Sequence, residues 1–316
     1  MECLVDVIRI GTRGSKLALA QAHWVGRKLE EGTGLRVEIV AITTRGDRFL
    51  DLPVTALSGK GIFVKEIEEA LLRGEIDLAV HSLKDLPSEF PRGLGLAAIL
   101  ERENPADVLV SRSHLRLKDL PGGAKIGTGS FRRQAQLLHY RPDLHLRPVR
   151  GNIDTRLKKL EKGEMDALVM AAAGLKRIGC EERVTEYLSP EICVSAAGQG
   201  AIAVEGREGH WASLRTAFLN HPPTAAEVTA ERAFLRRLGG GCQIPVGALA
   251  RMGDEHIRIT GVVADQEGTR LFRDEVSGAK DQGERLGETL AERLLEMGAG
   301  EVLLLREKEN VPRGAR

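Results

Sequence analysis

Two short segments of the sequence combine residue types that bind anions: Gly11-Thr12-Arg13-Gly14-Ser15 and Gly127-Thr128-Gly129-Ser130. Each follows a short apolar run and precedes a helical pattern. Backbone N–H groups, hydroxyls and the positive end of a helix dipole therefore point to one spot, which suits a carboxylate or a phosphate. The alternative is that Ser15 and Ser130 only cap their helices, since serine is a preferred residue at the start of a helix whether or not a ligand binds there.

Arginines near these segments favour the anion-binding interpretation. Arg13 is expected in the first loop, and Arg132 and Arg133 in the first turn of the second helix, where each cation opposes the helix dipole by about 0.3–1 kcal/mol. A bound anion would offset that cost. Further arginines are expected at strand ends or helix starts, where they could bind carboxylates in bidentate fashion: Arg150, Arg156 and Arg177. A solvated surface explains any one of these residues but explains the whole set less well.

A carboxylate and an amine, Asp85 and Lys84, follow an apolar strand predicted over residues 76–80. Open α/β sheets bind their ligands at such strand ends. Asp85 is therefore a candidate for chemistry, although it could equally be a turn or cap residue before Pro87.

Cys242 stands in a glycine-rich segment, Gly239-Gly240-Gly241-Cys242-Gln243-Ile244-Pro245. Backbone freedom and exposure are what a covalent attachment point needs. A lone cysteine is nevertheless more often inert than reactive, and the sequence does not give its pKa.

The elements that must position these residues begin with a βαβ unit. An apolar run over 4–10 predicts a strand, 16–31 a helix that ends at Gly32, and 37–42 a second strand. Parallel strands of this kind need a helical crossover between them. A helix over 63–73 and the strand over 76–80 follow.

An internal repeat extends this unit across the first two hundred residues. Three matches occur in the same order: Ile10 to Ser15 with Ile126 to Ser130, Arg45-Gly46-Asp47 with Arg150-Gly151-Asn152, and Gly74-Glu75-Ile76-Asp77 with Gly163-Glu164-Met165-Asp166. We therefore expect two similar α/β domains with a cleft between them.

The chain is expected to return to the first domain and then to change its pattern. A strand over 201–205 follows the small residues 196–200, which suit a hinge. Beyond 221–223, strands grouped between helices predict an α+β third domain. Its helices are expected over 225–238 and 281–297, and its strands over 244–250, 256–264, 269–276 and 302–305.

Composition narrows the class of protein. Of 316 residues, 42% are hydrophobic and 29% charged, which suits a globular protein of two or three domains. A net charge of +1 and an aromatic content of 3% argue against nucleic-acid binding. The four cysteines form no C-x-x-C pair, so we expect no metal site and no disulfide framework. Because the N-terminal residues lack a signal-peptide pattern and no stretch reaches membrane-span length, we expect a cytoplasmic protein.

Taken together, five separated motifs resemble the porphobilinogen deaminase family, in family order and over nearly the whole chain. They are Thr44-Arg45-Gly46-Asp47, Gly59-Lys60-Gly61-Ile62-Phe63-Val64-Lys65-Glu66, His81-Ser82-Leu83-Lys84-Asp85, Arg150-Gly151-Asn152-Ile153-Asp154-Thr155-Arg156 and Gly240-Gly241-Cys242-Gln243-Ile244-Pro245.

The resemblance implies the fold and the activity. It implies two domains like type II periplasmic binding proteins, one over 1–99 and 201–219 and the other over 100–200, and a smaller α+β domain over 220–316. It also implies stepwise head-to-tail condensation of four porphobilinogen molecules, with release of ammonia. The primer is a dipyrromethane cofactor in thioether linkage to Cys242, and hydrolysis releases hydroxymethylbilane. A monomer that hands its product to a tetrapyrrole-cyclising enzyme is the family expectation.

The resemblance also assigns roles to residues. Asp85 is implied to be the catalytic carboxylate, placed beside pyrrole nitrogens, where a fixed anion stabilises an electron-poor methylene-pyrrolenine. Lys60 is implied to lie in a loop that covers the cleft. The expected cofactor- and substrate-binding set is Arg13, Ser15, Lys60, Ser82, Lys84, Thr128, Gly129, Ser130, Arg132, Arg133, Arg150, Gly151, Asn152, Arg156, Arg177 and Gln199. Gly129 stands where many family members have serine, so a hydroxyl contact is replaced there by a backbone N–H.

Two other classes of protein remain as alternatives. A non-catalytic substrate-binding protein would also have duplicated α/β lobes and an anion cleft, but it would leave Cys242 and the third domain without a task. A nucleic-acid-binding protein would show binding that falls steeply with salt.

Overall fold

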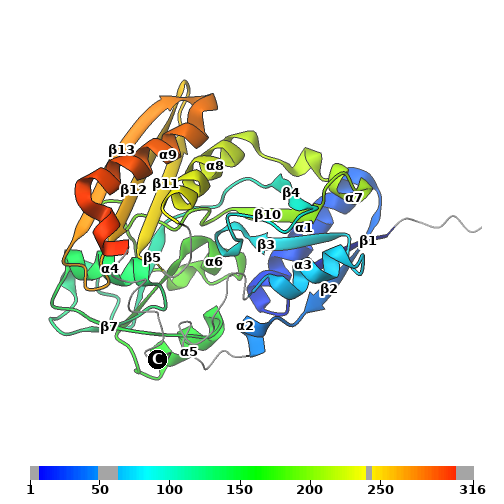
Figure 1. Ribbon diagram of the computed structural model, residues 1–316. Coiled ribbons are helices and arrows are strands. Elements are labelled where there is room, and N and C mark those ends of the chain that lie inside the picture. The colour runs from blue at the N-terminus through cyan, green and yellow to red at the C-terminus, as the bar shows by residue number, and fades with distance from the viewer. Residues whose placement is uncertain (1–6, 49–62, 240–243, 304–316) are drawn as a thin grey trace, which may run out of the picture.

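The computed structural model describes residues 7–48, 63–239 and 244–303 of the 316-residue chain. Two residues predicted to be functional, Lys60 and Cys242, lie outside these described ranges. Within them the chain forms three β-sheets, two of five strands and one of three (Figure 1).

The first sheet has the strand order β2-β1-β3-β10-β4. Strands β2, β1 and β3 are parallel, whereas β10 runs antiparallel to both β3 and β4. The chain therefore returns to this sheet after it has built the second one. The elements of this unit are β1 (Val7–Arg13), α1 (Lys16–Thr33), β2 (Arg36–Ile42), α2 (Arg45–Arg48), α3 (Lys65–Leu72), β3 (Leu78–Ser82), β4 (Leu94–Ile99), β10 (Ile202–Arg207) and α7 (Trp211–Leu214).

The second sheet repeats this plan with the order β7-β6-β8-β5-β9. Strands β7, β6 and β8 are parallel, and β5 runs antiparallel to both β8 and β9. The fold class predicted from the repeat and the resemblance is thus confirmed. The elements of this unit are β5 (Asp107–Ser111), β6 (Lys125–Gly127), α4 (Phe131–Tyr140), β7 (His145–Arg147), α5 (Ile153–Glu161), β8 (Ala167–Ala171), α6 (Ala172–Arg177) and β9 (Glu186–Tyr187).

Local sequence explains where the first helix of each unit begins. Ser15 precedes α1 and its hydroxyl accepts a hydrogen bond from the Ala18 N–H, while Ser130 does the same for Arg133 at the start of α4. Helix α1 ends at Gly34, whose φ of 69° is the left-handed conformation that glycine adopts without strain. The apolar face of α1 packs through Val25 and Leu29 against Ile8 and Ile10 of β1.

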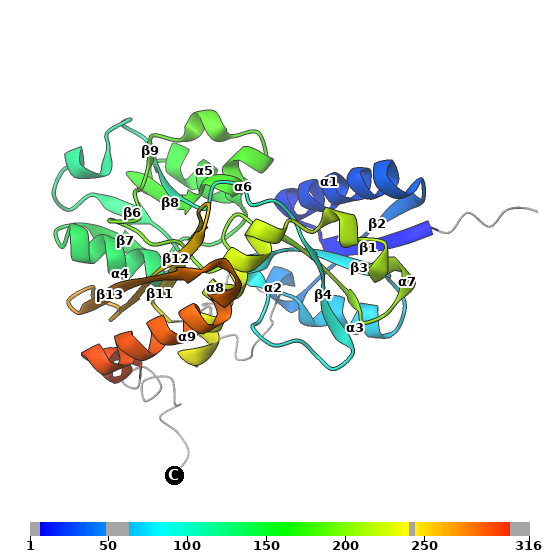
Figure 2. The ribbon, with the colours of Figure 1, turned by 90° about the horizontal axis from the view of Figure 1, so that it is seen from above.

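The third unit is an antiparallel sheet with two helices on one face. Its elements are α8 (Pro222–Arg237), β11 (Val246–Met252), β12 (His256–Ala264), β13 (Leu271–Ala279) and α9 (Gly283–Leu294). Phe234 of α8 and Leu290 of α9 are fully buried with Ile257 and Ile259 of β12. Figure 2 shows the two five-stranded units side by side, with this third unit against the second one and α8 reaching toward β4.

The strand predicted over residues 302–305 is wrong within the described range. Residues 300–303 are helical and continue from a π-helical turn, Leu295–Ala299, while residues 304 and 305 lie outside the described ranges. The physical reason is that Gly298, with a φ of 105°, lets the chain break α9 and begin a further turn of helix. A short apolar run such as this one cannot be distinguished from a strand by periodicity alone.

None of the helices in the described ranges has both the length and the apolar character that a membrane span requires.

Candidate active site

A pocket lies at the C-terminal ends of β1 and β3, the edge where open α/β sheets bind their ligands. Arg13 and Ser15 line it from the end of β1, and His81, Ser82 and Asp85 line it from the end of β3. Arg13 was expected in a loop and is instead the last residue of β1.

Asp85 is held at this pocket by a short, well-anchored turn. It is the last residue of a 3₁₀ turn, Leu83–Asp85, that follows β3. Leu83 and Leu86 on either side are 1% and 5% exposed, and the Leu83 N–H donates to the Ala201 carbonyl at 3.0 Å. The Asp85 side chain itself is exposed. The turn therefore fixes the backbone while it leaves the carboxylate accessible.

The pentapeptide that carries Asp85 occurs twice in the chain, which sequence analysis missed. Leu83-Lys84-Asp85-Leu86-Pro87 recurs as Leu117-Lys118-Asp119-Leu120-Pro121, and residues 117–119 also form a 3₁₀ turn. In the second copy, the carbonyls of Leu117 and Lys118 accept hydrogen bonds from Arg141. Asp119 is exposed and does not line the pocket of Asp85. Surroundings, and not local sequence, distinguish the two aspartates.

Lys84 points into a cationic region next to Asp85. Its ammonium group donates to the Gln199 side-chain oxygen at 3.2 Å. Burial and the neighbouring Arg133 lower the pKa of Lys84 to about 8, although Asp85 and Asp107 oppose this shift. Lys84 is therefore charged at neutral pH but loses its proton under mildly alkaline conditions.

Asp107, a residue that sequence analysis missed, organises much of this region. Its fully buried carboxylate lies 2.6 Å from Arg132 Nη1 and 2.7 Å from Arg133 Nη2, and it accepts from Gln199 Nε2 at 2.8 Å. Burial alone would raise the pKa of Asp107, but the two guanidinium groups outweigh burial and hold that pKa far below its usual range. Asp107 opens a strand with no motif around it, so the sequence carried no signal of its role.

Both adjacent arginines contact Asp107, but their other contacts differ. Arg132 is 4% exposed, and its Nη1 also donates to the Val194 carbonyl at 2.7 Å. Its contacts are therefore with the protein interior. Arg133 acts electrostatically on Lys84 and on Arg156, so it lies at the boundary between this buried network and the region near Asp85.

The arginines after β7 and on α6 add further positive charge. Arg156 donates through Nε to the Gly151 carbonyl at 2.8 Å, and Arg177 donates to the Gly200 carbonyl at 2.6 Å. Burial, with Arg133 and Arg150 next, lowers the pKa of Arg156 to about 10, and Asp85 opposes the shift. Burial also lowers the pKa of Arg177 to about 10. The repulsion that Arg133 and Arg150 exert on Arg156 shows that these three cations lie close together, in a region that favours a ligand with several carboxylates.

The hydroxyl-bearing residues of the two segments are partly occupied by local hydrogen bonds. Thr128 is buried and accepts from the Ser130 N–H at 3.3 Å, while Ser82 accepts from Gln21 at 3.0 Å. Ser15 and Ser130 both cap their helices, which is the role that the alternative to anion binding predicted for them. Gly129 is exposed, and a Cβ on it would come within 3.0 Å of the Val149 carbonyl oxygen, so any larger residue would need that backbone to shift.

Two further predicted residues lie on the rim of the region. Gly151 has a φ of 101°, and Asn152 is the exposed residue that precedes α5, with no side-chain capping bond.

Arg13 forms an ion pair with Asp47 at 2.5 Å, and its guanidinium group lies 4.2 Å from the ring centre of Phe63.

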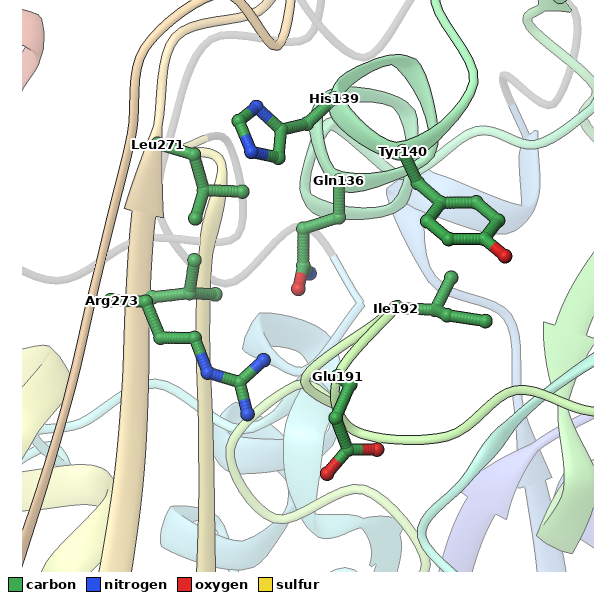
Figure 3. A pocket seen from close by; sticks show the side chains of 8 residues that line it. Gln136, His139, Tyr140, Glu191, Ile192, Leu271 and Arg273 are labelled. Carbon is green, nitrogen blue, oxygen red and sulfur yellow. The ribbon is translucent and has the colours of Figure 1, made fainter.

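A second cavity, of about 360 Å³, lies between α4 and the third unit, and its described lining includes none of the predicted site residues (Figure 3). The Gln136 amide is bonded to both the N–H and the carbonyl of Val194. His139 contacts the Gly268 carbonyl, and Arg273 donates to the Pro190 carbonyl. Its polar groups thus hold the second and third units together.

Comparisons with known proteins concern the family of the whole chain. A family model described as "Porphobilinogen deaminase, dipyromethane cofactor binding domain" matches residues 8–214, and one described as "Porphobilinogen deaminase, C-terminal domain" matches residues 225–296. Proteins named porphobilinogen deaminase are 52% identical in Pelobacter propionicus, over 94% of this chain and 96% of that protein, and 53% identical in Desulforudis audaxviator, over 93% and 96%. Among solved structures, the methionine-binding protein MetQ is 14% identical over 67% of this chain and 89% of its own, with a TM-score of 0.41.

Proposed function

This chain belongs to the porphobilinogen deaminase family, and from that premise we propose that Asp85 is its catalytic carboxylate. The protein is a transferase that condenses four porphobilinogen molecules head to tail on a dipyrromethane primer, releases ammonia and then frees hydroxymethylbilane by hydrolysis. The alternative, a non-catalytic binding protein, accounts less well for family models that match both the first two units and the third.

One observation carries the assignment of Asp85: an exposed carboxylate on an anchored turn, within electrostatic reach of Lys84 and Arg156. The carboxylate accepts hydrogen bonds from pyrrole N–H groups, which would otherwise lose their partners on leaving water. It also offers a fixed negative charge to the positive charge that develops as the amine departs. The surrounding cations hold the acidic side chains of the substrate and so set where its ring lies.

The residues present fit a dipyrromethane cofactor. Such a group carries carboxylate side chains, and burial together with neighbouring cations, Arg133 above all, lowers the pKa of Arg156 and Lys84. We propose that Arg133, Arg150, Arg156 and Arg177 hold those carboxylates and that Cys242 forms the thioether. When bound, the cofactor supplies the pyrrole carbon to which the first substrate is joined.

The remaining predicted residues take supporting roles in this proposal. The expected binding contacts comprise Arg13, Ser15, Lys60, Ser82, Lys84, Thr128, Gly129, Ser130, Gly151, Asn152 and Gln199, while Arg132, whose contacts lie in the protein interior, is expected to hold Asp107 and through it Arg133. The domain boundaries 1–99 with 201–219, 100–200 and 220–316 are proposed as well. We further propose that the protein works in the cytoplasm as a monomer and passes its product to a tetrapyrrole-cyclising enzyme.

The test uses the duplicated pentapeptide as an internal control. Asp85→Ala should fold normally but form hydroxymethylbilane at least about 10²-fold more slowly, because one preorganised electrostatic group commonly supplies about 10²–10³ in rate. Asp85→Glu should keep a small fraction of activity, since its oxygens are displaced in a step that is sensitive to errors of about 1 Å. Asp119→Ala removes the same residue from the same local sequence and should leave product formation unchanged.

The assay is product formation from porphobilinogen, with circular dichroism to verify the fold. If folded Asp85→Ala kept more than about a tenth of wild-type turnover, a smaller loss than one preorganised group causes, another carboxylate would have to be the catalytic one.

A further inference from the structure

Two buried carboxylates, Glu68 and Glu205, lie next to a histidine that lines the Asp85 pocket. His81 lines that pocket from β3, and its Nε2 lies 3.1 Å from Oε2 of Glu205 on β10. The His81 side chain is 4% exposed and that of Glu205 is fully buried. The two residues therefore connect the pocket to the interior of the first unit.

Glu68 of α3 is the third member of this group. It is 8% exposed, and burial followed by the nearby charge of Glu205 raises the pKa of Glu68 to about 7. Glu69, on the same helix, repels it as well. The charged groups that line the pocket side of His81 are Arg13 and Asp85. Within the described residues, both oxygens of Glu205 lack a hydrogen-bond partner, and its ion-pair contact is with His81.

The charges of Glu205 and Glu68 indicate what His81 can do. A buried carboxylate without a counter-charge costs several kcal/mol, and a proton on the imidazole 3.1 Å from Glu205 would supply that counter-charge. Glu68, held largely neutral below pH 7, prevents a second negative charge from accumulating at the same place. Glu205 therefore lies where it can stabilise a proton on the His81 ring.

We propose that His81 accepts the proton that the pyrrole ring loses at each condensation, and that Glu205 positions the imidazole for this step. The new C–C bond forms between the methylene carbon of one unit and the α-carbon of the next. The C–H bond at that α-carbon then breaks, its electron pair returns to the ring, and the proton passes to Nδ1 of His81, directly or through water. The positive charge of the electron-poor methylene group thereby moves to an imidazolium that Glu205 stabilises. Asp85 keeps the separate task of holding the pyrrole N–H groups and the developing cation.

This inference rests on the proposed function, so wild-type product formation is measured beside every variant. An inactive wild type would defeat the function, whereas an active wild type with unaffected variants would defeat only the role of His81.

The first variant is Glu205→Gln, with Glu208→Gln as its control. Glu208 is an exposed carboxylate just after the same strand, so its loss changes the net charge equally without touching His81. Glu205→Gln removes the negative charge that lies 3.1 Å from Nε2 of His81. The acid limb of kcat should therefore move to lower pH by about one unit or more, since an opposite charge at this range shifts a pKa by about 1–3 units. Turnover should fall about ten-fold or more, with KM nearly unchanged. A folded Glu205→Gln protein with the wild-type acid limb and turnover would overturn the proposal.

The second variant separates a proton-accepting role from a packing role. His81→Ala should lose about 10²–10⁴ in kcat, the usual contribution of a general base, and imidazole added to the buffer should restore part of it. The control Glu208→Gln should show no response to imidazole. His81→Ala also tests the proton-accepting role of His81 if the Glu205→Gln protein does not fold. Near-normal turnover in folded His81→Ala, or a loss that imidazole does not restore, would overturn the proposal.

Discussion

Lys84 shows how neighbours set the chemistry of a single residue. Its pKa of about 8 lies below the ordinary value because of burial and of Arg133 nearby. An amine in this position is a cation at neutral pH and becomes a neutral group above about pH 8. Asp85, next to it in the chain, is exposed.

The KM for porphobilinogen should therefore depend on pH. Because Lys84 is protonated below about pH 8, its attraction for a substrate carboxylate is present there and is lost as the pH rises through that value. KM should rise between pH 7 and 9 in the wild type and stay flatter in Lys84→Arg, which keeps its charge throughout. Steady-state kinetics over this range would test this, and a wild-type KM that is constant across it would contradict the prediction.

Loss of the Asp107 charge is expected to lower the free energy of unfolding. Asp107→Asn keeps the shape of the side chain but leaves Arg132 and Arg133 buried without their counter-charge, which typically costs about 3–5 kcal/mol. The free energy of unfolding, measured with urea, should fall by that order. The control is Asp143→Asn, which removes a carboxylate at the same 2.6 Å from an arginine, Arg141, on the surface and should change stability little. Equal losses in both variants would contradict the distinction between buried and exposed pairs.

At the scale of elements, the third unit depends on a close crossing of two helices. A Cβ on Gly287 of α9 would come within 2.1 Å of the Ala230 carbonyl of α8. Only glycine lets the two helices approach this far while Phe234 and Leu290 fill the space between them and the sheet.

Gly287→Ala should therefore destabilise the protein by about 1–3 kcal/mol, as overpacking usually does. Gly300→Ala is the matched control, because Gly300 is also helical, with a φ of −58°, and its Cβ would make only an ordinary contact 3.5 Å from Leu295. Thermal unfolding of both variants would show the difference. An unchanged Tm in Gly287→Ala would mean that the helices can separate at no cost.

At the scale of the whole molecule, a buried carboxylate of the third unit binds both segments that connect the first two units, the one after β4 and the one before β10. Glu231 of α8 accepts from the Gly198 N–H at 2.6 Å and the Ala250 N–H at 2.8 Å, and it pairs with Arg102 at 2.6 Å. Arg102 also donates to the Gln199 carbonyl at 2.8 Å. The segment where the chain returns to the first sheet is thus tied to the unit whose sequence contains Cys242.

The covalent link proposed for Cys242 has a direct readout. Purified protein should have a mass above that of the polypeptide by two linked pyrrole units, and Cys242→Ser should abolish the excess. Cys180→Ser is the control, because Cys180 is a partly exposed thiol in the second unit. Intact mass spectrometry gives the answer, and an unmodified mass in active wild-type protein would exclude the thioether.

The sequence by itself determined the features that depend on near neighbours in the chain. Ser15 and Ser130 mark the starts of α1 and α4 because a cap is made within three residues, and the ordered repeat gave two α/β units because the same pattern folds in the same way twice. The order of five motifs was enough to identify the family. The strand predicted over 302–305 is wrong at the described residues 302 and 303, because their helical conformation follows from the break at Gly298 and not from their own apolar side chains.

Only the tertiary structure decided what separates Asp85 from Asp119, which have the same five-residue sequence around them. Electrostatic energy depends on distance in space and on burial, and neither can be read from spacing along the chain. The same reason hid Asp107, which meets Arg132 and Gln199 across 25 and 92 residues of sequence. It also hid the contact of His81 with Glu205, because two strands far apart in the chain become neighbours only when β10 returns to pair with β3.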